Sequence, residues 1–98
     1  MSELSSLSVA QQRALLNSQQ VTPLDLVNGA LSCIEQVQPD LNCFVEVWAD
    51  EARERAQSVD TSAGGLAGIP IAIKDTSSWL GHKSTSGSRI FEHNVARH

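Results

Sequence analysis

The hydrophobic and polar positions follow a helical period in the first half of the chain and lose it towards the end. The first helix is expected over 9–17, because Ser8 and Gln11 have the spacing of a capping box, in which each side chain bonds the backbone of the other residue. The pattern therefore begins with a short helix that carries its own start signal.

A stronger start signal predicts a second helix over 22–37. Thr22 can cap this helix, Pro23 suits its first position, and Asp25 lies near the positive end of the helix dipole. Pro39 is expected to end the helix, because the residue before a proline is disfavoured in helical geometry. Within this helix, apolar residues recur at spacings of three and four, which predicts one buried face made of Leu24, Val27, Leu31 and Ile34.

Two short apolar runs indicate strands. Residues 43–48, "CFVEVW", are β-branched and aromatic, and residues 69–74, "IPIAIK", form an apolar run after a glycine turn, as in a strand buried on both faces. Between them, 49–57 reads as a polar surface helix with Glu51 four residues before Arg55. Helices and strands together predict an α/β arrangement.

The last part of the chain, 75–98, has no clear period and is expected to be a loop. It is rich in serine, threonine and glycine and holds all three histidines. The roles of Trp79 and of the stretch 82–98 stay open, although packing in the core or loop is the simpler expectation for Trp79.

Composition narrows the class of protein. The 98 residues suffice for one small domain, and a net charge of −4 argues against a general nucleic-acid binder. Cys33 and Cys43 do not form a zinc motif, so no metal or cofactor is expected, and Cys33 reads as a buried thiol. No leader or membrane-length apolar run is present in these residues, which favours a soluble cytoplasmic protein.

Lys74 is the main candidate for chemistry. A lysine that loses contact with water tends to become neutral, and a neutral amine can act as a base or proton relay. The pattern alone favours a simpler interpretation, in which Lys74 marks the end of the strand and extends its amine into water. In an extended segment the adjacent Asp75 would point to the opposite face.

Other chemical interpretations fit less well. In a phosphate-binding P-loop the lysine follows a glycine and opens a helix, whereas Lys74 follows an apolar run. Ser86, His93 and Asp75 supply the residue types of a Ser/His/Asp triad. The chain has so many serines, however, that such a match is expected by chance. His82 and His93 lack a third metal ligand at useful spacing and read as surface histidines.

The segment "GGLAGIPIAIKD" at 64–75 resembles the motif that carries the catalytic lysine in the amidase signature family. The resemblance continues in "VTPLDLVNGALSCIEQVQPDLNCFVEV" before it and in "GHKSTSGSRIFEHNVA" after it. It implies the family's α/β fold around a mixed sheet, of which this chain would supply the N-terminal helices and first strands. It also implies amide hydrolysis by a Ser–cisSer–Lys triad without a cofactor, with Lys74 as the triad base.

None of the serines here matches either triad serine of the family; those after the lysine are Ser77, Ser78, Ser84, Ser86 and Ser88. The resemblance therefore identifies 1–98 as an N-terminal fragment of an amidase domain. We expect it to be inactive alone, to fold marginally and to self-associate through an exposed strand edge.

Three functions compete on this basis. The complete enzyme would hydrolyse a small amide, with no direct contact to nucleic acid or membrane. Alternatively, it is the catalytic A subunit of a tRNA-dependent glutamine amidotransferase. The third possibility is a non-catalytic interaction module derived from an amidase.

Overall fold

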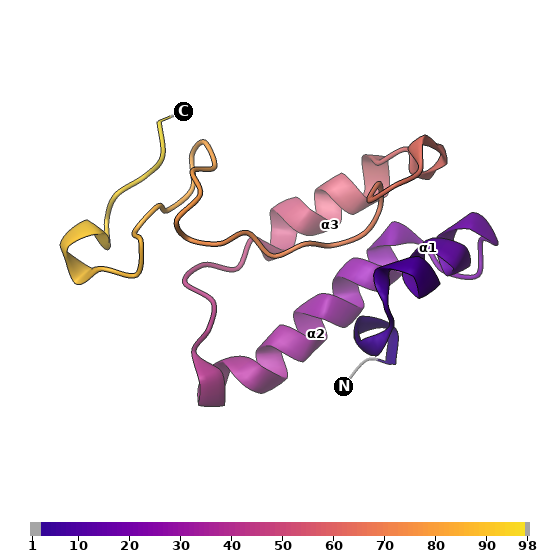
Figure 1. Ribbon diagram of the computed structural model, residues 1–98, viewed down its shortest axis with the longest axis horizontal. Coiled ribbons are helices and arrows are strands. Elements are labelled where there is room, and N and C mark those ends of the chain that lie inside the picture. The colour runs from indigo at the N-terminus through magenta and orange to yellow at the C-terminus, as the bar shows by residue number, and fades with distance from the viewer. Residues whose placement is uncertain (1–2, 98) are drawn as a thin grey trace. The chain divides into compact units, whose positions relative to one another are not determined.

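The computed structural model describes residues 3–97, which divide into two compact units. The first unit takes in the described residues up to Asn42 together with Trp48–Pro70. The second takes in Cys43–Val47 and the described residues from Ile71 onward. Helices α1, α2 and α3 belong to the first unit, whereas the second unit is mainly irregular (Figure 1).

Helices α1 (Val9–Asn17) and α2 (Pro23–Leu41) begin at the predicted caps Ser8 and Thr22, and both caps are capping boxes. The Ser8 hydroxyl accepts from the Gln11 amide at 3.1 Å, and the Gln11 side chain accepts from the Ser8 amide at 2.9 Å. Thr22 and Asp25 repeat the arrangement at 3.1 and 2.9 Å. Both start signals are thus confirmed, because each depends only on residues three apart.

The predicted end of the second helix was wrong. Helix α2 continues through Pro39 to Leu41 and ends at Asn42, which has a φ of +46° and donates its amide to the Gln38 carbonyl at 2.8 Å. Proline leaves the carbonyl of Glu35 without its helical donor, but on the exposed last turns of a helix water can replace that donor. Asparagine tolerates the left-handed conformation that stops a helix, so the stop lies at Asn42.

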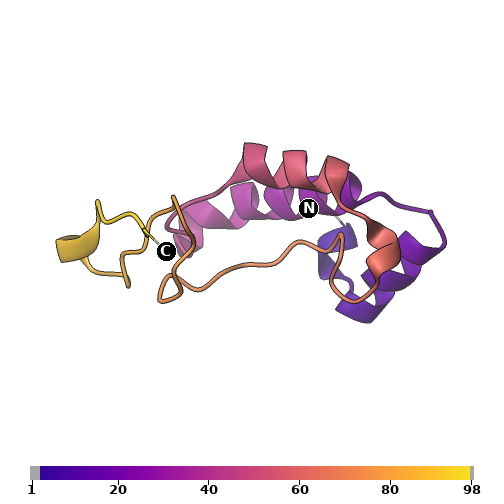
Figure 2. The same ribbon diagram turned by 90° about the horizontal axis from the view of Figure 1, so that it is seen from above.

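Helix α3 (Ala49–Ser58) packs along α2, as Figures 1 and 2 show. The core between the two helices consists of Val27, Leu31 and Ala56. Fully burying a valine or leucine side chain contributes roughly 1.5–3 kcal/mol. The pair expected on the polar face of α3 is present, with Arg55 Nη2 at 3.1 Å from Glu51 Oε1. The partly buried residues packed against this core are Leu24, Ile34, Ala49 and Ala52.

The glycine turn before the apolar run is held by Arg13 of α1. Its guanidinium donates to the carbonyls of Ala67 at 2.7 Å, Thr61 at 3.1 Å and Gly65 at 3.4 Å. The turn begins with a short 3₁₀ helix, η2 (Thr61–Ala63). One planar guanidinium thus binds three carbonyls of the turn, of which that of Thr61 also accepts from the Gly64 amide at 3.2 Å.

Neither predicted strand is formed within residues 3–97. Neither 43–48 nor 69–74 is a strand. The one β-bridge within residues 3–97 joins Lys83 to Val95. A strand exists only when its backbone pairs with a neighbouring strand, and no strand pairing within residues 3–97 includes either apolar run. Ile71 is accordingly 65% exposed instead of buried on both faces. The strand edge expected to drive self-association is therefore also not formed among these residues.

Two further short 3₁₀ helices complete the described structure, η1 (Glu3–Ser6) in the first unit and η3 (Arg89–Phe91) in the second. Over 3–97, no helix combines the length and the apolar character that crossing a membrane requires.

Gly68 should be harder to replace than Gly65, another glycine of the same turn. Its φ is +92°, and an added Cβ would lie 3.1–3.3 Å from Thr61, Pro23 and Leu16. Gly65 also has a positive φ (+58°) but has nothing within 4 Å of that position. We expect Gly65→Ala to cost about 1–2 kcal/mol of backbone strain and Gly68→Ala to cost about 1–3 kcal/mol more through overpacking. Urea unfolding followed by helix circular dichroism measures both; equal costs would contradict the packing.

Candidate active-site segment

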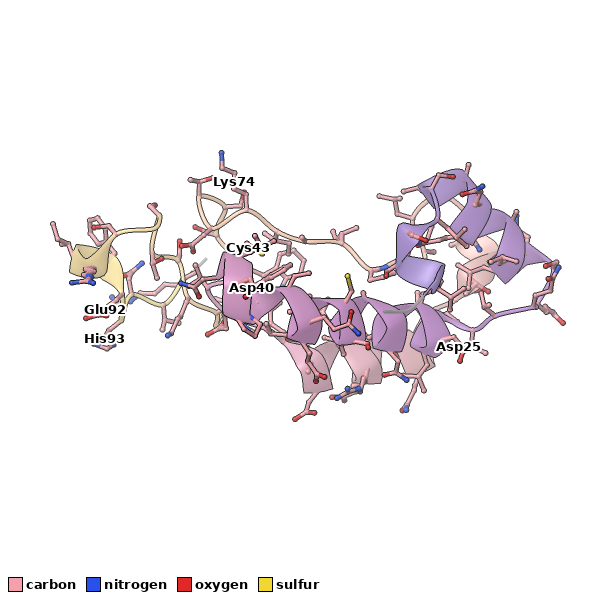
Figure 3. The ribbon with its side chains drawn as sticks, turned by 90° about the horizontal axis from the view of Figure 1, so that it is seen from below. Asp25, Asp40, Cys43, Lys74, Glu92 and His93 are labelled. Carbon is pink, nitrogen blue, oxygen red and sulfur yellow. The ribbon has the colours of Figure 1, made fainter. Side chains whose placement is uncertain are left out.

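Lys74 ends the extended run of the second unit and opens a turn. The amide of Ser77 donates to the Lys74 carbonyl at 2.9 Å, which closes the turn over 74–77. The Lys74 side chain is exposed, and Figure 3 shows it extending away from its own segment. The simple interpretation from the pattern, a lysine at the end of an apolar run with its amine in water, describes the chain as it stands. The desolvated amine implied by the family resemblance is not present, because none of the described residues of the second unit buries the Lys74 side chain.

The next residue, Asp75, is held by several hydrogen bonds to its carboxylate and backbone. Its carboxylate accepts from the Thr85 amide at 3.0 Å, from the Gly87 amide at 3.1 Å and from the Thr85 hydroxyl. The Asp75 carbonyl also accepts from the Ser86 amide at 3.3 Å. Asp75 is therefore bound through both its side chain and its backbone to the loop of residues 84–88, which we call the TSG loop.

The TSG loop has the backbone of an anion cradle. Ser86 (φ +52°) and Gly87 (φ +71°) both have left-handed geometry, which turns nearby amides towards one point. The Asp75 carboxylate occupies that point. Thr85 is only 4% exposed, so its hydroxyl needs a partner inside the protein and finds one in Asp75.

These bonds lower the pKa of the Asp75 carboxyl below its ordinary value of 3.8. The main cause is the bond from the Thr85 hydroxyl, followed by the bond from the Thr85 amide; partial burial opposes the shift and the Gly87 amide adds to it. Hydrogen bonds to a carboxylate favour its charged form, which is the form that the cradle holds. The contact is thus strongest when Asp75 is ionised.

The base of the TSG loop is fixed by a second piece of backbone. Ser84 donates its amide to the Asn94 carbonyl at 3.1 Å, and the Asn94 side-chain amide donates to the Ser84 carbonyl at 2.9 Å. Beside this pair lies the antiparallel bridge of Lys83 and Val95, and the Ala96 amide donates to the His82 carbonyl at 2.9 Å. The predicted irregular loop therefore has a defined internal framework.

Glu46 joins the 43–47 segment to the same framework. Its Oε1 lies 3.2 Å from His82 Nδ1 and accepts from the Lys83 amide at 3.4 Å. His82 is thus engaged by a carboxylate of its own unit instead of standing on the surface alone.

Within residues 3–97, the serines and His93 do not form a catalytic group. His93 is exposed beside Glu92, 3.6 Å from its Oε1, and lies apart from Lys74 in Figure 3. Asp75 bonds to Thr85, so the triad of Ser86, His93 and Asp75 is not assembled. No three metal-ligating side chains gather within residues 3–97.

The bond between Asp75 and Thr85 was not predicted from the pattern. The signals were a carboxylate directly after the lysine and a threonine, serine and glycine ten to twelve residues later. Serine and glycine favour left-handed turns, and such turns present amides to an anion. Nothing in the period of the sequence tells which anion fills the turn.

The family model and the similar proteins agree on the family to which this chain is related. Residues 25–98 match the family model described as Amidase. The relatives include the A subunit of a glutamyl-tRNA(Gln) amidotransferase from Granulibacter bethesdensis, 37% identical over 100 residues covering 97% of this chain and 20% of the relative. The Synechococcus sp. protein of the same name is 38% identical over 92 residues, covering 88% of this chain and 19% of the relative. No solved structure shows a significant match to the chain.

The carboxylate of Asp75 should keep the TSG loop closed down to acidic pH. Because the pKa of Asp75 is lower in the closed loop than in an open chain, its contribution is complete above about pH 4 and is lost as the pH falls through the lowered value. The Thr85 and Gly87 amide proton shifts, followed by NMR, should therefore titrate with a midpoint below 3.8. Asp75→Asn should abolish this titration; a midpoint at or above 3.8 in the unmodified chain would contradict the cradle.

Proposed function

The chain belongs to the amidase family, and on that premise we propose that it carries the lysine base of a Ser–cisSer–Lys amide hydrolase, with Lys74 in that role. The proposal is supported by the segment 64–75, whose glycine turn, apolar run and Lys–Asp pair lie inside the matched region. The chain spans about a fifth of the length of the curated relatives it matches, so the activity belongs to the proposal for the complete enzyme.

In the proposed mechanism the amine of Lys74 acts while neutral. It accepts a proton from a bridging serine, which accepts one from the nucleophilic serine as that oxygen attacks the amide carbonyl. Backbone amides hold the negative oxygen of the tetrahedral intermediate. The proton then passes to the departing nitrogen, and water releases the acyl group by the reverse path.

The exposure of Lys74 in this chain fits a proposal in which other parts of the complete enzyme cover it. Neither triad serine has a counterpart among residues 3–97, and the apolar run before the lysine is uncovered. We propose that 43–48 and 69–74 become strands of a mixed α/β sheet when neighbouring strands pair with them. The chain by itself is then inactive, because its lysine has no serine to deprotonate.

The relatives favour one substrate class. Each of those reported is named as the A subunit of a glutamyl-tRNA(Gln) amidotransferase. This makes the amidotransferase a stronger candidate than an amidase of unspecified small amides. It also weakens the expectation of no contact with nucleic acid, which rested on a net charge of −4 and on scattered basic residues that form no patch in the sequence.

Replacing Lys74 in an assembled enzyme tests the proposal. The 98 residues are joined to the part of the Granulibacter bethesdensis relative that follows its matched region, and amide hydrolysis is measured as ammonia released from glutamine. We expect Lys74→Ala to reduce kcat by about 10²–10⁴-fold, because the base is removed. Lys83→Ala, another lysine of the same unit, is the matched control and should stay active.

The outcomes separate the competing functions. An active Lys74→Ala enzyme would remove the lysine from the mechanism. A folded but inactive unmodified chimera would favour the non-catalytic module. Hydrolysis of simple amides without amide transfer to glutamyl-tRNA(Gln) would favour the general amidase.

A further inference from the structure

We infer that Asp75 and Thr85 are positioning residues for Lys74. The bonds between them fix the turn that carries the lysine, so their loss lowers the rate of catalysis although neither side chain touches the substrate. This inference rests on the proposed role of Lys74 as the base.

The turn over 74–77 links the position of Lys74 to that of Asp75. Ser77 closes the turn on the Lys74 carbonyl, and Asp75 occupies the next position. Consecutive Cα atoms lie about 3.8 Å apart across a trans peptide, so holding Asp75 also holds the base of the Lys74 side chain. Four hydrogen bonds from the TSG loop hold Asp75, three on the carboxylate and one on the carbonyl.

The TSG loop, which holds Asp75, is itself fixed by hydrogen bonds. The TSG loop is fixed at Ser84 by two hydrogen bonds to Asn94, one donated by the Ser84 amide and one donated by the Asn94 side chain. Gly87 also donates to the Thr85 hydroxyl at 3.3 Å, which keeps that hydroxyl oriented towards Asp75. A buried threonine and a fixed loop base make this a defined support for the lysine turn.

Asp75 has no direct contact with the Lys74 amine through which it could act electrostatically. Within residues 3–97 both of its carboxylate oxygens bond to the TSG loop, and no ion pair joins it to the Lys74 amine. Its effect on Lys74 therefore passes through the backbone of the turn. A positioning role of this kind matters, because a displacement of about 1 Å at a reacting group can cost on the order of 10²-fold in rate.

The experiment uses the full 98-residue chain in the chimera described above, with glutamine hydrolysis as the assay. Thr85→Val keeps the shape of the side chain and removes the hydroxyl, Asp75→Asn weakens the cradle, and Thr85→Ser keeps the hydroxyl. We expect Thr85→Val and Asp75→Asn to lower kcat by about 10–100-fold with KM unchanged, through misplacement of the lysine. Thr85→Ser should restore kcat towards the unmodified value.

A matched control is available at Asp60. Its carboxylate also organises a turn, accepting from the Ser62 amide at 3.0 Å and the Ser62 hydroxyl at 2.6 Å, but that turn belongs to the first unit and does not carry Lys74. Asp60→Asn should leave kcat unchanged. Hydrogen exchange of the peptide over 84–88 should accelerate in Asp75→Asn and Thr85→Val and stay as in the unmodified protein in Asp60→Asn.

The outcomes distinguish the inference from the function on which it rests. If Lys74→Ala is inactive while Thr85→Val and Asp75→Asn keep full kcat, the positioning role is overturned and the proposed function stands. A fall in kcat for Asp60→Asn equal to that for Asp75→Asn would also overturn it, since the effect would then be general destabilisation. An active Lys74→Ala enzyme overturns both.

Discussion

The contact between the Asp75 carboxylate and the TSG loop is the interaction on which the rest of the candidate site depends. Without it, the turn after Lys74 would be joined to the second unit mainly by the chain itself. With it, residues ten to twelve positions later hold both the backbone and the side chain of Asp75. The buried hydroxyl of Thr85 makes the contact costly to break, because an unpaired polar group inside a protein loses its hydration without compensation.

The motif at 64–75 thus has two differently supported halves. The glycine turn belongs to the helical unit, where Arg13 binds its carbonyls and Gly68 fits against the α1 and α2 region without room for a side chain. The lysine end belongs to the second unit, where the TSG loop holds Asp75. The apolar run between them has no such support within residues 3–97.

The sequence predicted features that depend on residues close together in the chain, but not those that depend on a distant partner. The starts of α1 and α2 were predictable because a capping box involves residues three apart, and the Glu51–Arg55 pair because it lies on one helix face. The strands over 43–48 and 69–74 were not, because their β-branched residues indicate suitability for a sheet and cannot supply the partner. The end of α2 was missed because Asn42, and not Pro39, provides the left-handed stop.

The candidate site shows the same limit. The residues of the motif led to Lys74, but its environment depends on groups distant in sequence, and in this chain the side chain is exposed. The partnership of Asp75 with Thr85 was also a tertiary contact that no local period reveals. The proposed chemistry at Lys74 requires two separate conditions: a fixed position, which we infer the TSG loop to supply, and a covered amine, which we assign to the complete enzyme.

The most direct measurement of the central contact is an NMR experiment that detects coupling across hydrogen bonds in the isotopically labelled chain. We predict a correlation between the Thr85 amide nitrogen and the side-chain carboxyl carbon of Asp75 at neutral pH. A well-resolved Thr85 amide that shows no such correlation, while backbone bonds of α2 are detected in the same experiment, would contradict the contact.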